Sequence, residues 1–228
     1  MEQDVPERKC AVVDLGLTDY AACLDIQRRL LSLRQQSKIY DALILTEHYP
    51  VITFGRGFRG EVPELPVPAY QIERGGEGTF HSPGQFVAYP VMNISENRVG
   101  VRTLVLRILE SAVYALEKQG VEAEARVSPV GVWTGGKKIG SLGIAVKRWV
   151  TFHGLAVNLN NDLGGFSYIN PCGMSPSTMT SAKKLLGREA DTARFRQDFV
   201  DSFMESFHFS PESLGIEGMP GFGVDTAV

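Results

Sequence analysis

Cysteine is scarce in this sequence, whose 228 residues contain only Cys10, Cys23 and Cys172. An odd and sparse set does not form a disulfide framework and is typical of proteins from a reducing compartment. No Cys-x-x-Cys pair and no His/Cys cluster with metal-ligand spacing occurs, so we expect no metal site.

Long apolar runs and an excess of positive charge are missing as well. No segment approaches the roughly 18 apolar residues of a membrane helix, and the N-terminal stretch lacks the apolar core of a signal peptide. The net charge of -3 and the pI near 5.9 do not favour nucleic acid or an anionic membrane as partner. We therefore expect a cytoplasmic protein that binds neither.

What is present is ordinary for a globular chain: 43% of the residues are hydrophobic and 21% are charged. This length and composition fit one domain with a sizeable core. We expect that domain to span residues 1–210. Residues 211–228 contain glycine and proline without periodicity, so we expect a loosely ordered tail there.

Hydrophobic periodicity predicts an α+β fold, with strands paired by turns and helices outside them. Expected helices lie near residues 18–36, 101–119 and 191–207, and expected strands near residues 9–15, 42–46, 51–54, 70–74, 85–94, 131–134, 138–146 and 149–159. Thr18 is the expected N-cap of the first helix, and Gly120 stands where the second should end. The glycine- and proline-rich stretch 56–68 is typical of a loop.

Segment 74–89 (RGGEGTFHSPGQFVAY) is unusually dense in glycine and polar residues. Gly75 and Gly76 have no Cβ, which lets backbone N–H groups approach a ligand closely. Arg74 can bind a phosphate, a carboxylate or a neighbouring acid, and His81 can carry a proton near neutral pH. The alternative is that this segment is only a glycine-rich hairpin with a structural histidine. Its length and unusual composition favour a functional role over that alternative.

A second segment, 137–156, gathers small residues behind a lysine pair. Gly140, Ser141 and Gly143 leave room for a ligand beside a strand that begins at Lys138. A lysine at the entrance of such a binding slot is partly desolvated. On these residues alone, solvated turn lysines are the simpler interpretation. A histidine such as His153 is more often structural than catalytic.

The third segment is the run Asn170-Pro171-Cys172-Gly173. A cysteine between proline and glycine is expected in a turn, partly exposed, which favours a reactive thiol. The run alone leaves the reactive and the inert thiol equally open. Cys10 and Cys23 lie within apolar patterns, so we interpret them as packing residues.

Together the three segments resemble the lipoyl(octanoyl) transferase family. The resemblance is carried by RGG-x-x-T-F-H-x-x-G-Q-x-V-x-Y at 74–89 and, in matching order, by EHYPVITFGR, KIGSLG, FHGLAVNL and INPCG. It implies the fold of biotin and lipoate protein ligases, a mixed, largely antiparallel sheet with flanking helices. It also implies an octanoyltransferase of lipoate biosynthesis that uses no ATP, no metal and no other cofactor.

The resemblance further implies a Cys/Lys catalytic pair. Cys172 matches the nucleophile that carries the acyl group as a thioester, and Lys138 matches the partner that favours the thiolate and acts as general base. Lys137 is the adjacent competitor, but only Lys138 directly precedes Ile-Gly-Ser-Leu-Gly. The implied substrate-binding residues are Arg74, Gly75, Gly76, Glu77, Gly78, Thr79, Phe80 and His81, then Ser141, Leu142 and Gly143, and finally Gly154, Leu155 and Ala156.

The implied donor is octanoyl-acyl carrier protein, and the implied acceptors are lipoyl domains of 2-oxoacid dehydrogenase complexes and the glycine cleavage H protein. An acidic carrier protein would need a local basic patch, because the net charge of -3 offers no attraction. After Pro-Cys-Gly the family usually continues with an acidic stretch, whereas this chain has MSPSTMTS. That departure bears on the local loop and on carrier preference rather than on the chemistry.

Three alternatives remain at this point. An ATP-dependent lipoate or biotin ligase shares the fold, but it carries a longer glycine run after its arginine and needs no nucleophilic cysteine. A non-catalytic module that binds acyl carriers or lipoyl domains has no need of both Cys172 and Lys138. A Cys–His hydrolase using His81 or His153 stays open, because Lys138 and Cys172 lie 34 positions apart.

Overall fold

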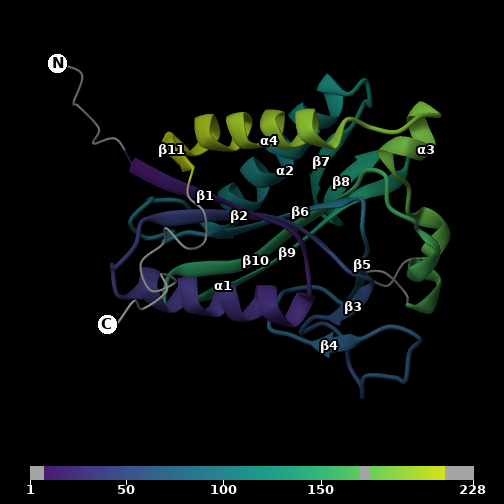
Figure 1. Ribbon diagram of the computed structural model, residues 1–228, viewed down its shortest axis with the longest axis horizontal. Coiled ribbons are helices and arrows are strands. Elements are labelled where there is room, and N and C mark those ends of the chain that lie inside the picture. The colour runs from purple at the N-terminus through teal and green to yellow at the C-terminus, as the bar shows by residue number, and fades with distance from the viewer. Residues whose placement is uncertain (1–7, 170–174, 214–228) are drawn as a thin grey trace, which may run out of the picture.

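An eight-stranded sheet forms the middle layer of the protein, with strand order β11-β1-β2-β6-β10-β9-β8-β7 (Figure 1). The computed structural model describes residues 8–169 and 175–213. The β11–β1 and β1–β2 pairings are parallel and the other five are antiparallel. The expected mixed, largely antiparallel sheet is therefore confirmed.

The helices lie on both faces of this sheet, α2 and α4 on one and α1 on the other (Figure 1). The helices are α1 (Tyr20–Gln35), α2 (Val101–Lys118), α3 (Ala182–Leu186) and α4 (Thr192–Phe207), with 3-10 turns η1 (Gly164–Tyr168) and η2 (Pro176–Thr178). The strands are β1 (Arg8–Thr18), β2 (Asp41–His48), β3 (Val51–Phe54), β4 (Ala69–Gln71), β5 (Gly78–His81), β6 (Gln85–Val91), β7 (Glu124–Val127), β8 (Val130–Thr134), β9 (Lys137–Lys147), β10 (Val150–Asn158) and β11 (Phe209–Ser213).

Each face of the sheet buries its own hydrophobic core. The larger core joins the sheet to α2 and α4, and the stripe Phe195, Phe199, Phe203 and Phe207 lies fully inside it, as the four-residue repeat predicts. The smaller core joins the sheet to α1. None of the helices in the described ranges is long and apolar enough to cross a membrane.

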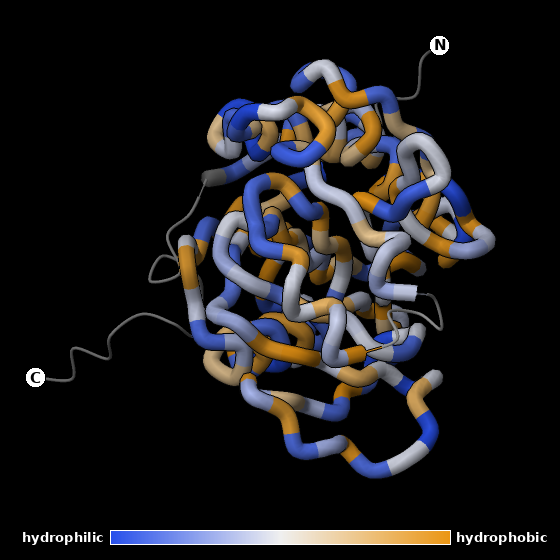
Figure 2. The backbone as a smooth tube through the Cα atoms, turned by 90° about the vertical axis from the view of Figure 1, so that its right-hand side faces the viewer, coloured by the Kyte–Doolittle hydropathy of each residue, from blue (hydrophilic) through white to orange (hydrophobic). Residues whose placement is uncertain are grey.

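A second, three-stranded sheet of order β4-β3-β5 lies beyond the N-terminal end of α1 (Figure 1). The loop between β3 and β4, residues 55–68, projects from the body at the bottom of both views (Figures 1 and 2). The strand β5 leads directly into β6 of the large sheet through the turn at Ser82–Gly84. The signature segment 74–89 thus connects the two sheets.

Most expected elements are confirmed, and the differences concern short elements and one cap. Asp19, rather than Thr18, caps α1, with its carboxylate accepting from the Ala22 N–H at 3.1 Å, while Thr18 ends β1. Strands β5 and β7 and helix α3 were not predicted, because stretches of four or five residues show too little periodicity. The strand β11 pairs with β1 and extends beyond the domain boundary expected at residue 210.

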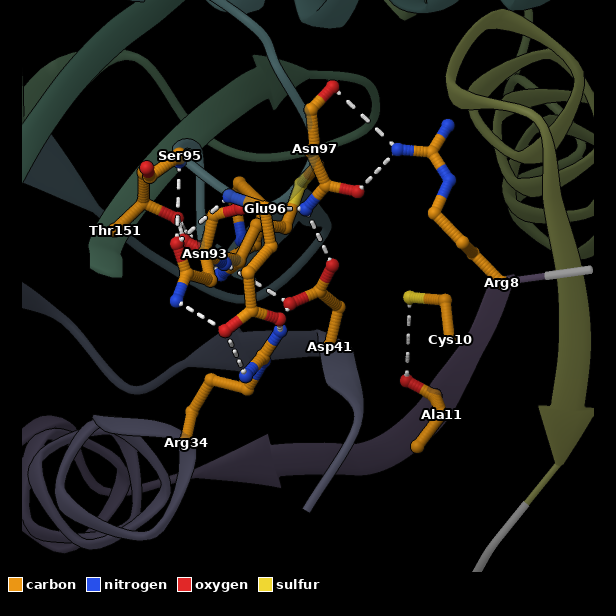
Figure 3. Close-up of polar contacts among 12 residues, drawn as sticks. Arg8, Cys10, Ala11, Arg34, Asp41, Asn93, Ser95, Glu96, Asn97 and Thr151 are labelled. Atoms are coloured by element: carbon orange, nitrogen blue, oxygen red, sulfur yellow. Dashed lines mark hydrogen bonds and ion pairs between the residues drawn. The ribbon is translucent and has the colours of Figure 1, made fainter. Parts of the chain in front are cut away.

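A partly buried polar cluster fastens the start of β2 to α1 (Figure 3). The Arg34 guanidinium donates to Asp41 at 2.7 Å and also pairs with Glu96. The second Asp41 oxygen accepts from the Asn97 amide at 2.6 Å, and Arg8 donates to Asn97 at 2.7 Å. Most of these groups satisfy one another, which stabilises the fold, although the buried Arg8 Nε has no hydrogen-bond partner among the described residues.

Candidate active site

The centre of the candidate site is a narrow pocket between β9, β10 and the glycine turn after β4. Its volume is about 50 Å³, several times the 10–15 Å³ that one water molecule needs. We call it the central pocket; it is lined by Tyr20, Arg74, Gly75, Gly76, Thr79, His81, Tyr89, Val130, Ser141, Leu142, Gly143, His153, Gly154, Leu155 and Ala156. The structure thus brings eleven of the fourteen expected substrate-binding residues together.

Three expected lining residues lie elsewhere, and for Gly78 and Phe80 the reason is that side chains alternate along β5. Thr79 and His81 point to the central pocket, whereas Phe80 packs against Phe166 in a separate apolar cluster. Glu77 and Gly78 line a second pocket of about 490 Å³, together with Phe58 and other residues. We call this the second pocket.

Small residues in β9 and β10 make the walls of the central pocket possible. A Cβ on Gly154 would stand 2.1 Å from the Ala88 carbonyl oxygen, so β6 and β10 can pair closely there only with glycine. A Cβ on Gly143 would stand 2.9 Å from the Gly75 oxygen. The glycine turn therefore rests directly on the backbone of β9.

Arg74 holds this glycine turn in place. Its guanidinium donates to the Thr53 carbonyl at 2.6 Å and to the Gly75 carbonyl at 2.9 Å. The Gly75 N–H in turn donates to the Ile144 carbonyl at 3.2 Å. The role of Arg74 seen here is to order the turn, and the Gly75 N–H is already engaged within the protein.

Aromatic rings form the opposite wall of the central pocket. The ring of Tyr20, at the start of α1, stacks on His81 with centroids 6.1 Å apart and packs edge-on against His48 at 5.2 Å. The His48 Nε2 lies 2.8 Å from the hydroxyl of Tyr89. Burial raises the pKa of Tyr20 and Tyr89, so both phenols stay protonated at neutral pH.

His81 is held as a neutral ring. Its Nδ1 lies 2.7 Å from Gln85 Oε1, and the Gln85 amide donates to the Phe80 carbonyl and to Asn158. This arrangement places the His81 proton on Nδ1. Burial, with smaller contributions from His48 and Arg74, lowers the pKa of His81 to about 3. A ring so easily deprotonated is a poor proton acceptor at pH 7.

His153 occupies an unusual position in the middle of β10. Its φ of 58° is in the left-handed region that non-glycine residues avoid, and Gln27 accepts from its backbone N–H at 2.9 Å. The ring is buried, with Nε2 3.6 Å from a Glu73 oxygen. Burial lowers the pKa of His153 to about 4, against the opposing effect of Glu73.

Lys138 lies beside the central pocket and is almost completely buried, with 1% of its surface exposed. Its side chain runs over Gly131, where a Cβ would stand 2.5 Å from the lysine Cε, and its Nζ lies 5.8 Å from the centroid of the Trp133 ring. Gly131 follows Val130, which lines the pocket. The adjacent Lys137 is exposed and donates to the Ser177 carbonyl at 3.4 Å. Of these two lysines, only Lys138 is therefore enclosed by the protein.

Cys172 lies outside the described residues, but the described chain that follows it is fixed next to Lys138. Met179 forms a β-bridge with Lys138, and the Thr180 N–H donates to the Lys138 carbonyl at 3.0 Å. Ile169, on the other side, belongs to the same apolar cluster as Met179.

The two other cysteines are packing residues, as expected. Cys10 and Cys23 are fully buried and unpaired. Burial raises the pKa of the Cys23 thiol to about 12 and that of Cys10 well above its usual value. Neither thiol is available as a nucleophile near pH 7.

Four residues of the central pocket were not predicted as site residues: Tyr20, Tyr89, Val130 and His153. Tyr89 and His153 stand inside the motifs quoted above, so their place in these motifs was the available signal. Tyr20 carries no such signal, because it reaches the pocket only through the packing of α1. Among residues 8–169 and 175–213, no group of His, Cys, Asp and Glu side chains is arranged to hold a metal ion.

Comparison with known proteins agrees with this geometry. Residues 19–204 match the family described as lipoyl protein ligase A/B catalytic domain. An octanoyltransferase of Desulforamulus reducens is 37% identical over 215 residues, covering 90% of this chain and 94% of the relative. A probable octanoyltransferase of Pyrobaculum arsenaticum is 42% identical over 178 residues, covering 78% and 82%.

Solved structures show the same fold at low sequence identity. A lipoate-protein ligase A bound with ATP superposes with a TM-score of 0.67 at 13% identity, covering 92% of this chain and 90% of the other. A biotin protein ligase from Aquifex aeolicus gives 0.55 at 14% identity, covering 87% and 70%. The chain therefore belongs to the lipoyl protein ligase A/B catalytic domain family, and within it to the lipoyl(octanoyl) transferases, which are acyltransferases.

Proposed function

We propose that this octanoyltransferase takes the octanoyl group from octanoyl-acyl carrier protein onto Cys172 and passes it to a lysine of a lipoyl domain. The acceptors are the lipoyl domains of 2-oxoacid dehydrogenase complexes and the glycine cleavage H protein. A solved relative of the same fold, from Thermoplasma acidophilum, is described as a lipoate protein ligase with its E2 lipoyl domain, which supports this acceptor class. We propose that the reaction needs no ATP, metal or other cofactor.

The observation that carries the proposal is the burial of Lys138 next to the chain that bears Cys172. Cys172 stands three positions after Ile169 in the sequence, a span of about 11 Å at most. Ile169 and Met179 pack in one cluster, and Met179 pairs with the Lys138 backbone. An ammonium group in this enclosed place favours a nearby thiolate more strongly than an exposed one does.

The first step exchanges one thioester for another. The Cys172 thiolate attacks the carbonyl carbon of the octanoyl thioester, the carrier thiolate leaves, and the Lys138 ammonium protonates this thiolate and becomes neutral. One C–S bond forms while another breaks, so the step is close to neutral in free energy. Backbone N–H groups near Cys172 and Gly76 are the proposed donors to the oxyanion.

The second step forms an amide. The amine of the acceptor lysine attacks the octanoyl-enzyme, the Cys172 thiolate leaves, and Lys138 in its neutral form takes the amine proton. An amide is more stable than a thioester, so the overall transfer is downhill without ATP. This distinguishes the proposal from an ATP-dependent ligase on the same fold.

The central pocket is the proposed place of the octanoyl chain. Burial of about seven methylenes at about 0.8 kcal/mol each would contribute about 5–6 kcal/mol to binding, which requires the pocket of about 50 Å³ to widen when the chain binds. Leu142, Leu155 and Ala156 supply apolar walls for the chain. His48, His81 and His153 have pKa values well below 7, so they line or back this space as neutral rings.

Intact-protein mass spectrometry tests the first step. The protein is mixed with octanoyl-acyl carrier protein without ATP, and we expect one octanoyl adduct. Cys172→Ser should abolish the adduct, while Cys23→Ala should retain it, because the buried Cys23 thiol is not reactive. Acyl transfer that begins only when ATP is added, with release of AMP, would instead support the ligase alternative.

A further inference from the structure

Charge is distributed very unevenly along this acidic chain. Residues 125–188 contain eight Lys and Arg residues but only one acidic residue, Asp162. The rest of the chain holds 15 basic and 25 acidic residues, out of totals of 23 and 26. The acid-poor stretch includes β8, β9, β10 and α3, which are the elements around Lys138. Although the net charge of the protein is negative, this stretch of the chain carries mainly positive charge.

Helix α3 starts at the rim of that site. Thr180 follows the Met179–Lys138 bridge, and the Ser181 hydroxyl accepts from the Lys184 N–H at 3.3 Å to cap the helix. The Lys183 N–H donates to the Leu159 carbonyl at 2.9 Å, which fixes α3 to the end of β10. Figure 1 shows α3 at the end of the molecule where β5 also lies.

The exposed side of α3 combines positive charge with an apolar residue. We call Lys183, Lys184, Leu185 and Arg188 the α3 patch; all four are exposed, and Leu185 exposes 46% of its surface. Lys183 pairs with Glu189 at 3.2 Å. Lys184 and Arg188 form no ion pair with any other residue that the structure describes. Their charges are therefore available to a partner.

We propose that the α3 patch is the docking surface for an acidic carrier protein that delivers the octanoyl thioester. This inference rests on the proposed function and names the surface that the donor uses. A negatively charged partner meets Lys184 and Arg188 while Leu185 offers an apolar contact, a combination suited to a transient interface. The acyl group is attached to its carrier protein through an arm that contains a phosphodiester, and this group brings a further negative charge to the rim of the site. An acceptor lysine is a cation, and a positively charged rim does not attract it.

The test compares two double charge reversals. Lys184→Glu with Arg188→Glu changes the α3 patch, and Lys147→Glu with Arg148→Glu makes the same change at the β9–β10 turn. That turn lies nine residues along β9 from Lys138, about 30 Å away, and it belongs to the same acid-poor stretch. Each variant is assayed with octanoyl carrier protein and with octanoyl-pantetheine, a small uncharged donor, at low and high salt.

We expect the α3 reversal to raise the KM for the carrier about 10-fold at low salt, because two attractive rim charges become repulsive. High salt should remove most of this difference, and activity with octanoyl-pantetheine should be unchanged. The reversal at the β9–β10 turn should leave the carrier KM within about 2-fold.

Three results would overturn the assignment of the patch while leaving the proposed function intact: a carrier KM that the α3 reversal does not change, an equal effect of both reversals, or a raised KM for the lipoyl domain instead. A wild-type protein that is inactive with both octanoyl donors would overturn the proposed function, and this inference with it.

Discussion

Replacing the buried lysine by an apolar side chain of similar length separates the two proposed roles of Lys138. In Lys138→Met the amine is lost, while the volume packed over Gly131 and near Trp133 is nearly kept. Such volume-conserving changes usually cost less than about 1.5 kcal/mol. We therefore expect a folded variant whose defect lies in the chemistry.

The first step should slow only modestly. A free cysteine with a pKa near 8.5 is about 3% thiolate at pH 7, and a pKa near 7 makes it about 50% thiolate, a gain of about 16-fold. The more acidic thiolate is about 5-fold less nucleophilic at a Brønsted slope near 0.45. Loss of the Lys138 amine should therefore slow enzyme acylation by about 3-fold to 16-fold.

The second step should slow far more, because it loses its general base. Loss of a positioned base typically costs about 10²-fold to 10⁴-fold. The octanoyl-enzyme of Lys138→Met should consequently accumulate when donor and lipoyl domain are both present. Rapid-quench mass spectrometry follows the adduct and the acylated domain separately.

The matched control is Lys137→Met, at the exposed neighbouring lysine. With octanoyl-pantetheine as donor, we expect both steps to keep rates within about 2-fold of wild type. Wild-type rates in Lys138→Met, or a second step slowed no more than the first, would refute the reasoning. Equal effects of the two substitutions would show that burial of the lysine does not matter.

Two further predictions concern stability. Gly154→Ala should destabilise the protein by several kcal/mol in chemical denaturation, because its Cβ would stand 2.1 Å from the Ala88 oxygen. The control Gly100→Ser should be neutral or stabilising by roughly a few tenths of a kcal/mol, since Gly100 caps α2 without a side-chain bond and has open space. A stable Gly154→Ala would contradict the close pairing of β6 and β10. The second prediction is a loss of stability as the pH falls below about 6.5, because His81 and His48 have pKa values lowered to about 3 and 4 and take up protons mainly when unfolded. Each buried histidine should cost about 2 kcal/mol between pH 6.5 and 5; unfolding curves that coincide at the two pH values would show that these rings are not held neutral.

Elements with strong periodicity could be predicted from the sequence, and short elements could not. The phenylalanine stripe of α4 and the end of α2 before Gly120 follow from local pattern and glycine geometry, since Gly120 has a φ of 86°. Strand β11 owes its existence to pairing with the distant β1. Its few residues carry no periodic signal of their own.

The site shows the same division. The motif resemblance identified most residues of the central pocket. Side chains alternate along β5, however, so Phe80 packs in a separate apolar cluster, and a sequence motif does not show which of its side chains point away from the pocket. Tyr20 lines the central pocket only because α1 packs across β6 and β10. The choice between Lys137 and Lys138 was made on the motif, and the burial of Lys138 gives it a physical reason.

The measurement that tests the central claim most directly is a chase of the isolated octanoyl-enzyme. The protein is loaded from octanoyl carrier protein, freed of donor by gel filtration, and mixed with a lipoyl domain in the absence of ATP. A two-step transfer through Cys172 predicts that the octanoyl mass moves stoichiometrically from enzyme to the domain lysine. An adduct that stays on the enzyme, while the domain is acylated only when donor or ATP is supplied, would contradict it.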